Sequence, residues 1–137
     1  MIDPQSLARL ALFADLDAPR LQAVAQMLDE ESFEGGTRVL RAGISGGAFY
    51  VITDGAADVV IGGEPRTRLG AGDYFGEGSI LTGEVPIADV VAAGGELRCA
   101  VLDGPELRPL LLEHPAIAVR MLEASARRLR STSLWAG

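Results

Sequence analysis

The residues with the clearest chemical potential lie in one glycine-rich segment, residues 70–81. Gly72-Asp73 is a turn signal, Tyr74-Phe75 is a strand fragment, and glycine at position 76 lets the backbone come close to a ligand. Small residues follow the glutamate at position 77 and can open a short helix, whose first N–H groups attract anions. A carboxylate beside such groups suits a ligand that carries both hydroxyls and a phosphate. The candidate ligand-binding residues of this segment are Gly76, Glu77, Gly78 and Ser79.

This segment resembles the phosphate-binding cassette of the cyclic-nucleotide-binding domain family, whose pattern runs G-D-x-F-G-E-x-(A/S)-L-L. The resemblance implies that Glu77 holds the ribose by accepting a hydrogen bond from a hydroxyl, which is a strong charge-assisted contact. It also implies that the backbone N–H groups of Gly78 and Ser79 meet the phosphate. The similarity extends from Phe13 to about Leu129 and includes A-x-Y/F-x-I-x-x-G at residues 48–55 and E-H-P at residues 113–115.

The family pattern continues as P-R-x-A-T/S-V-x-A, and its arginine pairs with the phosphate. In an ungapped alignment Pro86 takes the arginine position and Asp89 takes the Thr/Ser position, which the resemblance places at the ligand. Losing a charge-assisted hydrogen bond costs about 1.5–3 kcal/mol. A carboxylate about 4 Å from a phosphate would cost up to about 4 kcal/mol more. We therefore expect cAMP and cGMP to bind weakly or not at all.

Three explanations of the missing arginine remain open. The ligand differs from a cyclic nucleotide, another arginine substitutes, or the pocket is empty. Arg98 is the nearest candidate in sequence, although a strand arginine more often faces solvent. In the third case Gly76 and Glu77 only complete a corner of the fold, with the carboxylate at a helix N-terminus.

The other chemically capable residues give no support to catalysis or to a metal site. The chain has one histidine, His114, outside the expected strands, whereas a metal centre needs several ligands together. Ser79 has no general base in evidence, and nucleophilic catalysis needs one. Cys99 is alone, which excludes a disulfide framework, and we expect it to be a small buried hydrophobe. We expect neither an enzyme nor a cofactor.

Size and charge narrow the function further. The 137 residues suit one domain, and the net charge of −7 argues against general nucleic-acid affinity, because such affinity rests on neutralising phosphates. No apolar stretch approaches the roughly 20 residues that span a membrane. The N-terminus has neither a positive region nor a long apolar run, so we expect a cytoplasmic protein without a membrane partner.

The elements that must position the cassette follow from periodicity and turn residues. Asp3 with Pro4, and then Asp17, predict two helices within residues 1–30. Short β-rich runs separated by glycines fill residues 31–102 and predict a double-stranded β-helix or jelly roll. The expected strands are residues 31–33, 37–41, 48–53, 57–61, 67–69, 89–92 and 97–102. Helices return in residues 103–131. The whole chain is thus predicted to be one mainly β domain with flanking helices, similar to a cyclic-nucleotide-binding β-roll.

The last predicted helix runs from Pro115 to about Arg130 and offers more apolar surface than the roll can cover. Its stripe comprises Ala118, Leu122, Ser125 and Leu129, with Ile117, Met121 and Ala124 alongside. We expect a homodimer through this helix, with Met121 and Leu122 near the middle of the seam. Its arginines complement the helix dipole, and Trp135 beyond it is either a lid over a base or a tail.

Two functions therefore remain. The first is a small regulatory or ligand-sensing module that binds a cyclic nucleotide or another small phosphate-bearing ligand through an altered cassette. The second is a protein–protein interaction or dimerisation module that kept the fold and lost the ligand.

Overall fold

The computed structural model describes residues 2–44 and 47–136, with side chains described as far as Arg130. Three short helices open the chain: α1 (Pro4–Ala8), η1 (Ala11–Phe13) and α2 (Ala18–Met27). Their starts follow from capping. The carboxylate of Asp3 accepts a hydrogen bond from the N–H of Gln5 at 3.0 Å, and that of Asp17 accepts one from Arg20 at 3.1 Å. The two predicted N-terminal helices are confirmed.

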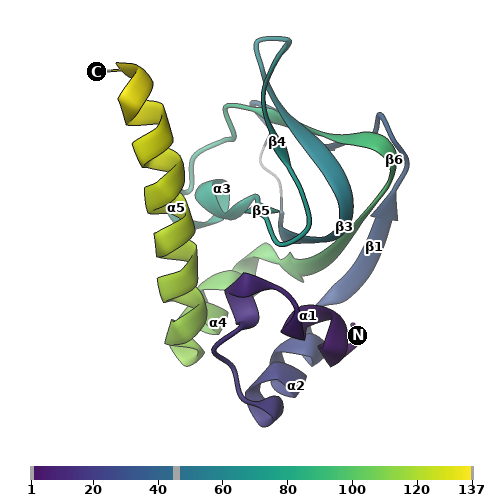
Figure 1. Ribbon diagram of the computed structural model, residues 1–137, viewed down its shortest axis with the longest axis vertical. Coiled ribbons are helices and arrows are strands. Elements are labelled where there is room, and N and C mark those ends of the chain that lie inside the picture. Colours follow the sequence, from purple (N-terminus) through teal and green to yellow (C-terminus); the bar gives the residue numbers. More distant parts are fainter. Residues whose placement is uncertain (1, 45–46, 137) are drawn as a thin grey trace.

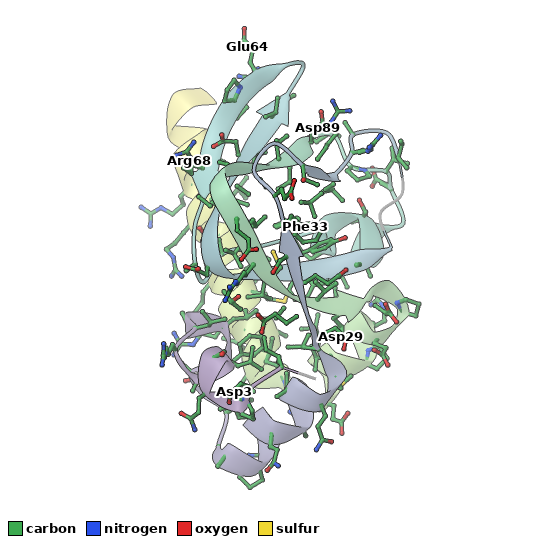
Figure 2. All side chains as sticks on the ribbon, turned by 90° about the vertical axis from the view of Figure 1, so that its right-hand side faces the viewer. Asp3, Asp29, Phe33, Glu64, Arg68 and Asp89 are labelled. Carbon is green, nitrogen blue, oxygen red and sulfur yellow. The ribbon has the colours of Figure 1, made fainter. Side chains whose placement is uncertain are left out.

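Six antiparallel strands form the sheet: β1 (Asp29–Phe33), β2 (Arg38–Leu40), β3 (Ala48–Ile61), β4 (Glu64–Leu69), β5 (Tyr74–Phe75) and β6 (Asp89–Asp103). The main order is β1-β6-β3-β4, while β2 pairs with β6 and β5 pairs with β3. Figure 2 shows β1 rising from Asp29, beside the helical layer, to Phe33 in the roll. The expected antiparallel β-roll with flanking helices is confirmed, and its sheet is not closed.

Two of the predicted strand breaks are wrong. The expected strands at 48–53 and 57–61 are one strand, β3, and those at 89–92 and 97–102 are one strand, β6. The glycines between them bend the strands. Gly55 has φ +89°, and a Cβ there would lie 2.5 Å from the carbonyl oxygen of Glu96. The pairing of β3 with β6 shifts register on either side of Asp54, so the two long strands turn the corner together.

Alternation along β6 divides the core in two. Ala100 and Leu102 face the helices, where they join a cluster with Leu7, Phe13 and Val24. Cys99 and Val101 face the interior of the roll, beside Leu69, Phe75 and Val90. The thiol of Cys99 is fully buried, as predicted, and burial raises its pKa to about 12. The roll therefore has its own apolar interior, separate from the contact with the helices.

The C-terminal helices are η2 (Gly104–Glu106), α4 (Leu107–Glu113) and α5 (Pro115–Ala136). α5 runs along one side of the molecule, and in this view α3 and β5 lie between it and the roll (Figure 1). Arg120 of α5 forms an ion pair with Asp15, with Nε 2.7 Å from Oδ2, and so ties the helix to the N-terminal layer. No helix in the described part of the chain is long and apolar enough to cross a membrane.

The predicted faces of α5 need one correction. Met121, expected in a dimer seam, is a core residue with 6% of its surface exposed. It lies on the inward face with Ile117 and Ala124, which pack on the helical cluster. Leu122 and Leu129 are 70% and 67% exposed, so the outward face is still apolar. Trp135 lies outside the described side chains.

Candidate functional site

The glycine-rich segment folds as predicted, into a turn, a strand, a second turn and a short helix. β5 pairs with β3, and α3 (Glu77–Thr82) begins directly after Gly76. Gly76 has φ +93°, and a Cβ there would lie 2.5 Å from the carbonyl oxygen of Ala48. This position therefore requires glycine for its approach to β3, whereas the sequence suggested only an approach to a ligand. Gly83, with φ +77°, ends the helix.

A cavity of about 460 Å³ opens beside α3. Four of the five predicted site residues line it: Gly76, Glu77, Gly78 and Ser79. Apolar side chains of the roll supply much of the remaining wall, together with the loop that follows α3; they include Leu40, Val59, Leu69, Val85, Pro86, Ile87 and Val90. The position aligned with the family's arginine, Pro86, thus borders the cavity. Its carbonyl oxygen accepts a hydrogen bond from the N–H of Gly43 at 2.8 Å, which fixes the loop.

Asp89, the fifth predicted residue, is not among those that line the cavity. Its carboxylate accepts a hydrogen bond from the N–H of Ala42 at 2.7 Å and lies 3.7 Å from Nε of Arg38. Successive strand side chains point to opposite faces, and its neighbours Ala88 and Val90 are the ones that line the cavity. Asp89 lies in the upper part of the roll (Figure 2). The carboxylate expected to repel a phosphate therefore holds β6 to the end of β2 instead.

Glu77 contributes a carboxyl group that is only partly solvated. Burial raises its pKa, and this effect is the largest. Hydrogen bonding from the backbone N–H groups of Glu77 and Gly78 and the positive charge of Arg128 oppose the rise. In such a site an oxygen acceptor has little competition from water, so a hydroxyl group of a ligand would form a strong hydrogen bond with it.

Arg128 is a positively charged lining residue that the sequence did not predict. Its guanidinium carbon lies 4.7 Å from the centre of the Tyr74 ring, and Nη2 donates to the Tyr74 carbonyl oxygen at 3.4 Å. The Tyr74 hydroxyl in turn donates to the carbonyl oxygen of Met121 at 2.8 Å and lies 3.1 Å from Oγ of Ser125. α5 is therefore attached to the cassette at two points, and one of them brings a positive charge to the cavity.

Helical spacing contained a signal for this residue. Arg128 follows Ile117, Met121 and Ala124 at intervals of four, three and four, so it continues the face of α5 that packs inward. From the sequence, the arginines of this helix were interpreted only as complementing the helix dipole. Which of them lies on the inward face was not considered.

Arg98, the nearest candidate in sequence for a substitute arginine, does not line this cavity. Its Nε pairs with Oε1 of Glu96 at 2.8 Å. It borders a different hollow of about 770 Å³ near α1 and η1, which it shares with Arg9, Asp54 and Asp73. This hollow mixes both signs of charge and contains no residue of α3. Within residues 2–44 and 47–136 no three histidine, cysteine, aspartate or glutamate side chains are grouped as a metal site.

Comparison with known proteins identifies similar chains. The family model of the cyclic nucleotide-binding domain matches residues 30–114, which is more than half of the chain. The cGMP-dependent protein kinase egl-4 of Caenorhabditis briggsae is 35% identical over 103 residues. That match covers 71% of this chain and 14% of the kinase, so the chain spans only a small part of this relative.

Solved structures share the fold. The catabolite activator protein of Thermus thermophilus is 26% identical with a TM-score of 0.77, covering 90% of this chain and 60% of that one. The regulatory subunit of a cAMP-independent protein kinase A from Trypanosoma brucei is also 26% identical with a TM-score of 0.77, covering 90% and 45%. A triple mutant of it, in which one substitution introduces an arginine, is bound to cAMP in its A site; it is 25% identical with a TM-score of 0.76, covering 95% and 49%.

Proposed function

This chain belongs to the cyclic nucleotide-binding domain family, and we propose that it is a regulatory module that senses a cyclic nucleotide, with an affinity lowered by its altered cassette. The observation that carries the proposal is the cavity beside α3, where Glu77 and Gly76, Gly78 and Ser79 meet apolar walls. The module acts by binding and release, and its residues perform no chemistry on the ligand.

The cavity suits the parts of such a ligand. Its volume of about 460 Å³ falls within the range of small-molecule sites, roughly 300–1,000 Å³. Glu77 would accept a hydrogen bond from the free ribose hydroxyl, because its carboxyl oxygens are partly buried and poorly hydrated. Leu40, Val59 and Val90 would cover the apolar faces of the sugar and base.

The absence of arginine from the cassette supports the lowered affinity. Pro86 stands at the arginine position and borders the cavity without offering a donor. The Trypanosoma brucei structure gives a parallel, since the protein is described as cAMP-independent and a variant with a new arginine is described as bound to cAMP. We expect an arginine at position 86 to strengthen cAMP binding by this chain in the same way.

Calorimetric titration with cAMP and cGMP tests the proposal on the wild type and on Pro86→Arg. The new charge-assisted hydrogen bond should strengthen binding by about 1.5–3 kcal/mol, which is roughly 10- to 100-fold. Pro19→Arg is the matched control, because it makes the same exchange at an exposed position on α2. If neither nucleotide binds to either the wild type or Pro86→Arg, the proposal is wrong. Sub-micromolar binding by the wild type would refute the lowered affinity alone.

A second role, dimerisation, is supported by the outward face of α5. Val119, Leu122 and Leu129 are more than half exposed, and with Ala126 they follow one another at intervals of three, four and three. This is the spacing at which helices pair in a coiled coil. The partner that we propose is a second copy of this chain. If the cavity proves empty, this interaction surface is the function that remains.

A further inference from the structure

We propose that Arg128, which lies on α5 and outside the cassette, is the residue that binds the phosphate of the ligand. The inference rests on the function proposed above, because it names the group that replaces the missing arginine. Arg128 and the family's arginine lie on different elements. The family's arginine would be on the loop that follows α3, whereas Arg128 reaches the same cavity from the C-terminal helix.

The charges around the cavity make a cation necessary. Three charged residues line it in the described part of the chain: Glu77, Glu84 and Arg128. A phosphate that met the two carboxylates alone would be repelled. Arg128 is the positively charged residue among these three and offsets one of the two carboxylates. Its charge already acts on the carboxyl group of Glu77.

The geometry of Arg128 suits this task. Its guanidinium lies over the face of the Tyr74 ring, with its carbon 4.7 Å from the ring centre, and Tyr74 is 2% exposed and fixed by its hydroxyl. A guanidinium has five N–H donors in a planar fork, so it can contact the ring and a phosphate at the same time. One N–H is directed to the Tyr74 carbonyl oxygen at 3.4 Å, which is a long contact that a phosphate oxygen can replace or share.

The position of Arg128 has a mechanical consequence. A phosphate held by an arginine of the loop after α3 would leave α5 untouched. A phosphate held by Arg128 would join α5 to α3, because the ligand would contact both at once. Occupation of the cavity would therefore add to the present attachment of α5 to the cassette, which consists of the Tyr74 hydroxyl contacts with Met121 and Ser125 and the contact of Arg128 with Tyr74.

Calorimetry on the full chain tests the inference with Arg128→Gln and with its neighbour Arg127→Gln as control. The control removes the same charge from α5 at a residue that does not line the cavity. We expect Arg128→Gln to weaken cAMP binding at least about tenfold and Arg127→Gln to leave it within about twofold. Adenosine, which has the same base and ribose without the phosphate, should bind equally to wild type and Arg128→Gln. Unchanged melting temperatures would show that both variants fold.

The double variant Pro86→Arg/Arg128→Gln separates this inference from the proposed function. If Arg128 binds the phosphate, the cassette arginine should restore the affinity that Arg128→Gln loses. Equal cAMP affinity of wild type and Arg128→Gln would overturn the inference and leave the proposed function intact. An equal loss of adenosine and cAMP affinity would also overturn it, since the arginine would then hold the nucleoside. Failure of wild type, Pro86→Arg and the double variant alike to bind cAMP would overturn both.

Discussion

The sequence left two roles open for the carboxyl group of Glu77, which are binding of a ligand and stabilisation of the start of α3. Burial raises its pKa above the ordinary value of 4.5, so the charged form is less favourable in the folded protein than in the unfolded chain. A residue kept only to stabilise the start of α3 would be expected to gain from its charge. The backbone N–H groups of Glu77 and Gly78 do favour its charge, but burial opposes them more strongly. Such a net cost is found at ligand sites as well as in structural networks.

Replacing Glu77 by Gln should change how the stability of the protein depends on pH. The folded protein binds more protons than the unfolded chain between pH 4.5 and the raised pKa, so wild-type stability falls as pH increases through that window. The glutamine side chain does not titrate, so the variant does not lose stability in this window for this reason. Denaturant unfolding at several pH values should show the variant gaining on the wild type above pH 4.5, with no gain below it. A variant that is less stable at neutral pH would assign Glu77 a structural role.

Individual site residues could be predicted from the sequence where the motif is local. Gly76 and Glu77 belong to one continuous segment, and that segment folded as expected. Arg128 could not be predicted from a local motif, because it contacts Tyr74, which lies 54 positions earlier in the chain. Asp89 was assigned by alignment alone, and the alternation of strand side chains turns its carboxylate toward Ala42. Its neighbours in sequence, which have no charge, are the residues that reach the cavity.

At the scale of elements, the order of helices and strands followed from caps, periodicity and turn residues. The continuity of β3 and β6 did not. A glycine pair or an Asp-Gly step normally ends a strand, but here Gly55 and Gly94 take positive φ values inside strands whose hydrogen bonding continues. Sequence shows that the chain bends at these residues. It does not show whether the paired strand bends at the same place. That depends on the pairing of two segments about 40 residues apart in the chain.

The attachment of α5 to β5 gives the element-scale prediction. The hydroxyl of Tyr74 is buried and serves both the carbonyl oxygen of Met121 and the side chain of Ser125. Tyr74→Phe should lower the free energy of unfolding by about 0.5–1.5 kcal/mol, because it removes this donor and leaves the ring in place under Arg128. Denaturant unfolding measures the change.

The chain's other tyrosine supplies a matched control for this prediction. Tyr50 stacks on Phe75, and its hydroxyl makes no hydrogen bond within the described residues. Tyr50→Phe should therefore change stability by less than about 0.5 kcal/mol. Equal effects of the two substitutions would mean that the Tyr74 hydroxyl does not hold α5.

At the scale of the whole molecule, α5 is the element that connects the separate parts. Its first half belongs to the helical cluster through Ile117 and Met121. Its second half brings Arg128 to the cavity of the roll, while Leu122 and Leu129 face outward. One helix thus touches the core, the proposed ligand and the proposed partner.

The outward face of α5 leads to the final prediction, on assembly. Leu122 lies near the middle of the heptad-spaced face and is 70% exposed, so Leu122→Glu leaves the core intact and places a charge in the proposed seam. Light scattering should give the wild type a mass twice that of the 14.3 kDa chain and give the variant the mass of one chain. Leu112→Glu, at a 78% exposed leucine on α4, should remain dimeric. A wild type that stays monomeric at high concentration would contradict the proposed dimer. A Leu122→Glu variant that is still dimeric would show that the dimer interface does not involve this face of α5.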